Sequence, residues 1–89
     1  MFYVYILQCV EDFSFYTGQC EDLDRRMSKH RDGFSKYTGS KGSWRLVYFE
    51  AYPTRSAAIK REREIKQKKS RKYIEKLITV WRSSLRPGG

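Results

Sequence analysis

The segment FYVYILQCVEDFSFYTGQC, residues 2–20, decides the fold because it contains two β-type runs separated by two acidic residues. The runs, residues 2–10 and 13–20, are rich in β-branched and aromatic side chains, which favour strands. Glu11 and Asp12 lie between them, and such polar residues are typical of turns. The segment therefore predicts a β-hairpin with a tight turn at this acidic pair.

The predicted turn sets the register of the hairpin. The numbers of facing residues then sum to 23, so Tyr5 faces Gly18 and Leu7 faces Tyr16 on one face of the sheet. Gly18 has no side chain, and we expect it to leave room for a ligand beside the two tyrosines. The other face is apolar and is predicted to be core; it carries Phe2, Val4, Ile6, Val10, Phe13 and Phe15.

The rest of the chain predicts one more strand and three helices. A short helix covers residues 21–33, and a Gly/Ser-rich loop follows at 34–43. Strict alternation in the strand at 44–52 would put Val47, Phe49 and Ala51 on one face, with Leu46, Tyr48 and Glu50 on the other. A second helix runs to about Lys69, and an amphipathic third helix follows. The expected N-caps are Asp22 or Glu21, Thr54 and Ser70.

These elements predict an α/β domain of the α+β type, with a three-stranded antiparallel sheet flanked by helices. The 89 residues suffice for one domain, which we place at 1–82, with 83–89 as a flexible C-terminal tail. The register separates Cys9 and Cys20 beyond disulfide reach, which predicts two structural thiols. No stretch has the roughly 20 apolar residues of a membrane span, and we expect a soluble cytoplasmic protein without membrane contact.

The net charge of +9 is confined to one part of the chain. Residues 1–53 hold seven basic and seven acidic residues, whereas residues 54–89 hold twelve basic and three acidic ones. Nucleic acid or an anionic membrane could use this charge, and a solvated helical surface would show it as well. Charge alone does not choose between these three interpretations.

Three polar residues of the predicted helices lie on faces that should be buried. At roughly 100° per residue, Arg26 and His30 border the apolar face of the first helix, whereas Arg25 points almost the opposite way. Glu62 lies on the apolar stripe of the second helix, whereas Glu64 faces away.

With Tyr5 and Tyr16, these residues form a shortlist of five. Each has a structural explanation by itself, such as packing, snorkelling of an arginine or an ion pair within one helix. Their joint occurrence on inward faces favours a functional site.

Four ordered motifs resemble the GIY-YIG nuclease superfamily. They are YVY at 3–5, YTG at 16–18, DLDRRMSKH at 22–30 and EREIK at 62–66, and the likeness extends over residues 2–78. KYT and LVYFEAYPTRSAAIKRE also recur in its small stand-alone bacterial branch. Tyr3 and Thr17 depart from the Gly and Ile of the family name, but they fall between the catalytic positions.

The resemblance implies metal-dependent endonuclease activity on DNA, more than on RNA, with a place in DNA repair or processing. Arg26 would hold the scissile phosphate, Tyr16 or Tyr5 would help take a proton from the attacking water, and Mg²⁺ or Mn²⁺ would bind Glu62. The implied catalytic residues are Tyr5, Tyr16, Arg26 and His30; the metal ligand is Glu62, and Gly18 and Lys66 would contact substrate. Because no targeting domain is expected, a homodimer or a protein partner could direct the cut.

Two other functions remain open. The same fold could serve as a non-catalytic basic module that binds nucleic acid. Alternatively, the stripe from Tyr73 to Trp81 could bind a partner protein if it were exposed, although we expect it to be core. The second YTG, residues 37–39, lies in the predicted loop, and we interpret its identity with the first copy as coincidence.

Overall fold

The computed structural model describes residues 1–31 and 44–85, with the backbone alone for 28–31 and 85. The predicted loop at 34–43, with its YTG, and the residues after 85 lie outside this part. The elements in chain order are β1 (Phe2–Cys9), β2 (Phe15–Cys20), α1 (Leu23–Arg31), β3 (Trp44–Tyr52), α2 (Arg55–Lys68) and α3 (Arg71–Leu85). α3 therefore extends three residues into the segment expected as a tail.

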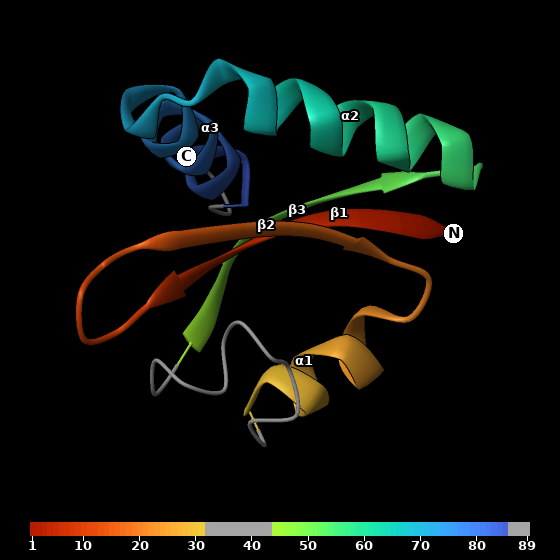
Figure 1. The fold of residues 1–89 in the computed structure, drawn as a ribbon, viewed down its shortest axis with the longest axis horizontal. Coiled ribbons are helices and arrows are strands. Elements are labelled where there is room, and N and C mark those ends of the chain that lie inside the picture. The colour runs from red at the N-terminus through yellow and green to blue at the C-terminus, as the bar shows by residue number, and fades with distance from the viewer. Residues whose placement is uncertain (32–43, 86–89) are drawn as a thin grey trace.

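The described elements form three layers. The strands make one antiparallel sheet in the order β2-β1-β3, so β1 is central and β2 and β3 are its edges. Figure 1 shows α2 and α3 on one face of this sheet and α1 on the other. The predicted α+β fold, an antiparallel sheet flanked by helices, is confirmed. Within the described residues no helix is long and apolar enough to cross a membrane.

The hairpin has the predicted register. Tyr5 pairs with Gly18 and Leu7 with Tyr16. Cys9 and Cys20 are both buried and form no disulfide with each other, as expected.

The connection between β1 and β2 differs from the predicted tight turn. β1 ends before Val10 and β2 begins after Ser14, so the loop is wider than two residues. Asp12 Oδ1 accepts hydrogen bonds from the backbone N (3.0 Å) and Oγ (2.7 Å) of Ser14, and Phe13 has a positive φ of 62°. The prediction that Val10 and Phe13 are core residues is wrong, because this loop turns both out to solvent.

A β-bulge in β3 breaks the strict alternation expected of that strand. Ile6 of β1 pairs with Tyr48 and Leu7 pairs with Leu46, which leaves Val47 without a facing residue. Leu46 consequently packs on the α1 side, and Val47 is buried with Tyr48 on the side of α2 and α3. The predicted faces are therefore wrong for the first half of β3.

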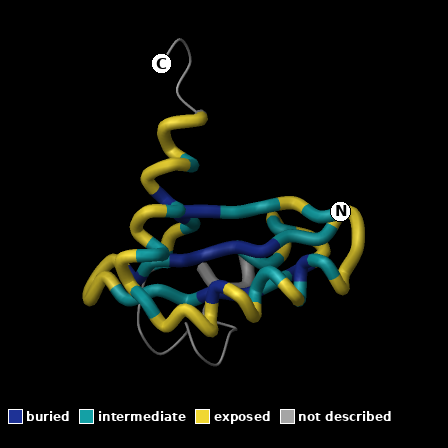
Figure 2. Tube along the Cα trace, turned by 90° about the horizontal axis from the view of Figure 1, so that it is seen from above, coloured by how far each residue is buried: buried dark blue, intermediate teal, exposed yellow. Residues whose placement is uncertain are grey.

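Each face of the sheet has its own hydrophobic cluster, and Figure 2 shows the buried residues concentrated in the strands. Under α2 and α3 the buried members are Val4, Ile6, Val47, Tyr48, Ala58, Ile65 and Ile78. Under α1 they are Tyr5, Leu7 and Cys20. The apolar stripe of α3 packs against the first cluster, as predicted, although the last turns of this helix project from the body (Figure 2).

Side-chain caps fix the starts of the helices where the sequence predicts them. Thr54 Oγ1 accepts the amide of the residue three positions later at 3.2 Å, and Ser70 Oγ does the same at 3.2 Å. Asp22, rather than Glu21, caps α1 through its Oδ1 at 3.1 Å. α2 ends at Lys69, which has the left-handed conformation common at helix C-termini.

Candidate active site

Tyr5 lies at the centre of the candidate site and is completely buried, with 0% exposure. Its ring occupies the space beside Gly18: a Cβ at that glycine would be 2.6 Å from Tyr5 Oη and 2.8 Å from Cζ. This space was expected to admit a ligand, but the structure fills it with the phenol of Tyr5. Because Gly18 has no side chain, the hydroxyl of Tyr5 on β1 can lie over the neighbouring edge strand β2.

Tyr16 lies beside Tyr5 on β2 and is only half-buried. Its ring centroid is 6.3 Å from that of Tyr5 and 6.5 Å from that of Trp44. The two predicted site tyrosines are therefore neighbours, one inside the sheet and one reaching the surface.

Arg26 comes from α1, which covers this face of the sheet. Its helix packs through Leu23 and Met27 against the cluster that contains Tyr5. Arg26 is half-buried, whereas Arg25 is exposed, as the helical periodicity predicts. The backbone of His30 lies one turn further along α1, but its side chain is outside the described part, so the proposed role of this residue stays a prediction.

Glu62 comes from α2, on the opposite face of the sheet. Its side chain is 18% exposed and forms an ion pair with Lys66, with 2.8 Å between Nζ and Oε2. Glu64, in contrast, is 49% exposed and pairs with Arg61. Glu62 therefore borders the buried side of its helix, as predicted.

Side chains from three other elements influence the pKa of the Tyr5 phenol. Burial raises the pKa of this phenol most, the neighbouring Tyr16 and Glu62 raise it further, and the positive charge of Arg26 lowers it. Because burial dominates, Tyr5 remains a protonated hydrogen-bond donor at neutral pH. Tyr5, Tyr16 and Arg26 thus lie on the α1 side of the sheet, whereas Glu62 belongs to α2 on the other face.

Glu62 offers a single carboxylate for a metal ion. Among residues 1–31 and 44–85, no three His, Cys, Asp or Glu side chains gather as a metal cluster. A zinc site would need several protein ligands, whereas Mg²⁺ or Mn²⁺ keeps several waters and is often bound by one or two carboxylates and substrate phosphates. The partly exposed carboxylate fits such a hard cation, which would have to displace Lys66 from it.

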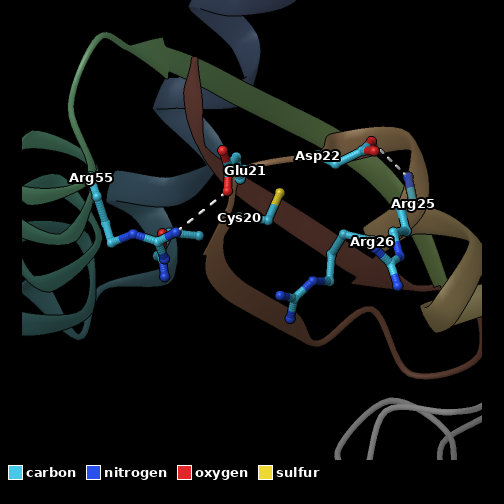
Figure 3. Close-up of a pocket in the computed structure, with 7 residues that line it drawn as sticks. Cys20, Glu21, Asp22, Arg25, Arg26 and Arg55 are labelled. Carbon is cyan, nitrogen blue, oxygen red and sulfur yellow. Dashed lines mark hydrogen bonds and ion pairs between the residues drawn. The ribbon is translucent and has the colours of Figure 1, made fainter.

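A pocket of about 350 Å³ opens at the β2 edge of the sheet (Figure 3). Arg26 lines it from α1, and Arg55 approaches from the start of α2. Gln19 also lines it, and its Oε1 is a buried atom without a hydrogen-bond partner in the described part of the chain. The helical pattern of the sequence drew attention to Arg26 alone, because Arg55 belongs to the exposed first turn of a helix.

Glu50 and Arg61 form a further polar cluster that connects β3 to α2. Arg61 Nε lies 3.0 Å from Glu50 Oε1, and both side chains are 20% exposed. Tyr48 and Tyr52 donate hydrogen bonds to the same carboxylate, and Arg61 donates another to the hydroxyl of Tyr73 at 3.1 Å. Because Arg61 precedes Glu62 in the helix, this cluster fixes the rotation of α2. An acidic residue facing the core beside Tyr48 was the available signal in the sequence.

Comparisons with known proteins agree on one family. The family model described as "GIY-YIG catalytic domain" matches residues 1–74. The UPF0213 protein BH0048 of Halalkalibacterium halodurans is 44% identical over 79 residues, covering 88% of this chain and 82% of that protein. UPF0213 proteins of Haloquadratum walsbyi and Staphylococcus aureus are 49% and 46% identical, over 72% and 83% of this chain and 72% and 95% of their own lengths.

A solved structure is also similar. The solution NMR structure of the UPF0213 protein BH0048 matches with a TM-score of 0.57 and 44% identity, over 90% of this chain and 85% of the other. Its printed name states no activity.

Proposed function

Because the chain belongs to the GIY-YIG family, a nuclease superfamily that acts on nucleic acid, we propose that it is a metal-dependent endonuclease hydrolysing phosphodiester bonds in DNA. The proposal includes a cytoplasmic role in DNA repair or processing, with a homodimer or a protein partner directing the cut. The observation that supports it most is that Tyr5 and Tyr16 are neighbours on the face of the sheet that α1 covers, with Arg26 on that helix.

Arg26 has the features required to bind the scissile phosphate. It is half-buried, it lines an open pocket, and its charge acts on the hydroxyl of Tyr5. A guanidinium group binds phosphate oxygens with two parallel hydrogen bonds and stabilises the negative charge that develops in the transition state. We assign it this electrostatic role.

The two tyrosines have different roles in this proposal. Tyr5 is buried and its pKa is raised, so it donates a hydrogen bond and does not accept a proton. Tyr16 reaches the surface, where its phenolate form could contact the attacking water and receive its proton as the general base. The difference in burial supports Tyr16, rather than Tyr5, in this role.

Glu62 would hold the Mg²⁺ or Mn²⁺ ion. When bound, such an ion offsets negative charge on the leaving oxygen. Lys66 neutralises Glu62 in the structure and would supply a further positive charge to a substrate phosphate. His30 keeps its proposed catalytic role on α1, one turn beyond Arg26.

The test is cleavage of branched, nicked, single-stranded and duplex DNA, with RNA of the same sequences, in Mg²⁺, Mn²⁺ or EDTA. Glu62→Gln should lower the cleavage rate by roughly 10²–10³-fold, the scale expected for the loss of a catalytic electrostatic group. Glu64→Gln is the matched control and should cut like the parent. If no substrate is cut, or if Glu62→Gln cuts as fast as the control, the proposal is wrong.

The rival function makes a distinct prediction in the same assay. A basic module without catalysis would bind DNA with strong salt dependence and give no metal-dependent product. It would also keep its affinity when Tyr16 and Glu62 are replaced.

A further inference from the structure

The pocket at the β2 edge continues the candidate active site toward α2. Its lining residues are Gln19, Cys20, Glu21, Asp22, Arg25, Arg26 and Arg55. Figure 3 shows Arg26 reaching toward the pocket from α1 and Arg55 reaching in from α2. The starts of both helices, with their positive dipole ends, therefore border one hollow.

The pocket has an excess of positive charge that its own acids do not fully neutralise. Three arginines line it with two carboxylates. Asp22 is engaged as the N-cap of α1. Glu21 forms an ion pair with Arg55 at 3.5 Å, with the side chains 69% and 54% exposed. An exposed pair of this kind is weak, so Arg55 can exchange Glu21 for a stronger anionic partner.

We propose that this pocket binds the backbone phosphate next to the scissile one, with Arg25 and Arg55 as its ligands. The inference rests on the proposed function for the identity of the substrate. Arg26 is shared by the pocket and the candidate active site, so a phosphate held here is adjacent to the reacting one. A volume of about 350 Å³ lies at the low end of the roughly 300–1,000 Å³ typical of ligand sites, which suits one phosphate with its sugar.

Glu21 gives the site a built-in competitor. In the free protein its carboxylate holds Arg55, and an incoming phosphate must displace it. Bidentate binding of a phosphate by arginine is a charge-assisted interaction that favours this exchange. Replacement of Glu21 should therefore strengthen DNA binding, and a misfolded variant would not show such a gain.

The experiment measures DNA binding without cleavage, by fluorescence anisotropy in EDTA over a series of salt concentrations. Arg55→Gln and Arg25→Gln should each weaken binding about tenfold and reduce the slope of log K against log salt by about 0.7–0.9. Glu21→Gln should tighten binding several-fold. Arg82→Gln, on the exposed last turn of α3, is the matched control and should change the slope by less than half as much.

Methylphosphonate substitutions identify the phosphate involved. One backbone phosphate is neutralised at a time. The affinity of the parent should fall when the phosphate next to the scissile bond is neutralised. The affinity of Arg55→Gln, which already lacks this contact, should not fall further at that position. Arg55→Gln and Glu21→Gln variants that bind like the parent, or additive losses at every position, overturn the assignment. Free inorganic phosphate that competes at micromolar concentration would point to a small-anion site and would also overturn it.

The two proposals fail in different ways. A parent that cuts DNA while Arg55→Gln binds normally removes the pocket assignment and leaves the nuclease intact. A parent that never cuts but in which one phosphate position is coupled to Arg55 keeps a phosphate-binding pocket and removes the proposed catalysis. A parent that binds no DNA overturns both.

Discussion

Replacement of Glu50 by alanine should destabilise the domain strongly. The carboxylate accepts hydrogen bonds from Tyr48, Tyr52 and Arg61, and the arginine contacts it through both Nε (3.0 Å) and Nη2 (3.2 Å). Glu50→Ala leaves two phenols without this acceptor and Arg61 with its weaker contacts to Glu64 and Tyr73. The loss therefore combines unpaired hydroxyl groups with a half-buried charge that has lost its main counter-ion.

The expected loss in the free energy of unfolding follows from the burial of the Glu50–Arg61 pair. Hydrogen bonds to a charged group such as this carboxylate contribute about 1.5–3 kcal/mol each. Loss of one partner of a fully buried pair costs about 3–5 kcal/mol, and loss of an exposed one about 0–1 kcal/mol. For side chains that are 20% exposed we expect about 3 kcal/mol. In a domain of this size that lowers Tm by roughly 12–24 °C.

Urea unfolding followed by far-UV circular dichroism measures this loss. Glu50→Gln keeps an acceptor for the phenols and should cost about half as much. Glu64→Ala is the control: it removes another carboxylate of the same arginine, 49% exposed, and should cost about 0.5 kcal/mol or less. If Glu50→Ala costs less than 1 kcal/mol, or no more than Glu64→Ala, the cluster does not hold α2 to β3.

Three further predictions concern the tyrosines and the metal ligand. Gly18→Ala should cost about 1–3 kcal/mol in a thermal melt, because its Cβ would fall 2.6 Å from Tyr5 Oη; an unchanged Tm would contradict this. Lys66→Met should raise the affinity of Glu62 for Mn²⁺ several-fold in titrations without nucleic acid, because a competing ammonium group is lost; equal affinity would show that the ion pair is irrelevant. The pKa of Tyr52 is raised to about 12, mainly by burial, so its protonated form stabilises the fold. Stability should be full below pH 10 and fall as the pH rises toward 12, and the fall of the urea midpoints over this range should be less steep in Tyr52→Phe, with Tyr5 contributing to the part that remains.

The sequence predicted the features that depend on neighbours along the chain. The hairpin register, the caps at Thr54 and Ser70, and the inward phase of Arg26 and Glu62 are all local patterns. Each is set by alternation, helical periodicity or a side chain that bonds its own turn.

Features set by distant partners escaped prediction. The bulge at Val47 exists only in the pairing of β3 with β1, and no residue near it in sequence marks it. The positive φ of Phe13 belongs to a loop that Asp12 stabilises by its hydrogen bond from Ser14. The amino-acid sequence was equally compatible with a two-residue turn. The pocket that joins Arg25 of α1 and Arg55 of α2 depends on the strand order, which places β2 at the edge of the sheet.

The burial of Tyr5 has a consequence for how relatives of this chain are judged. The same side chain is the middle of the cluster under α1 and the centre of the candidate site, so selection for stability alone would retain it. A descendant that has lost nuclease activity would keep Tyr5 and Gly18 as a packing pair. Its partly exposed positions, Tyr16, Arg26 and Glu62, would be free to drift. Under the proposed function, those three positions, and not the buried tyrosine, are the ones expected to separate active members of the lineage from inactive ones.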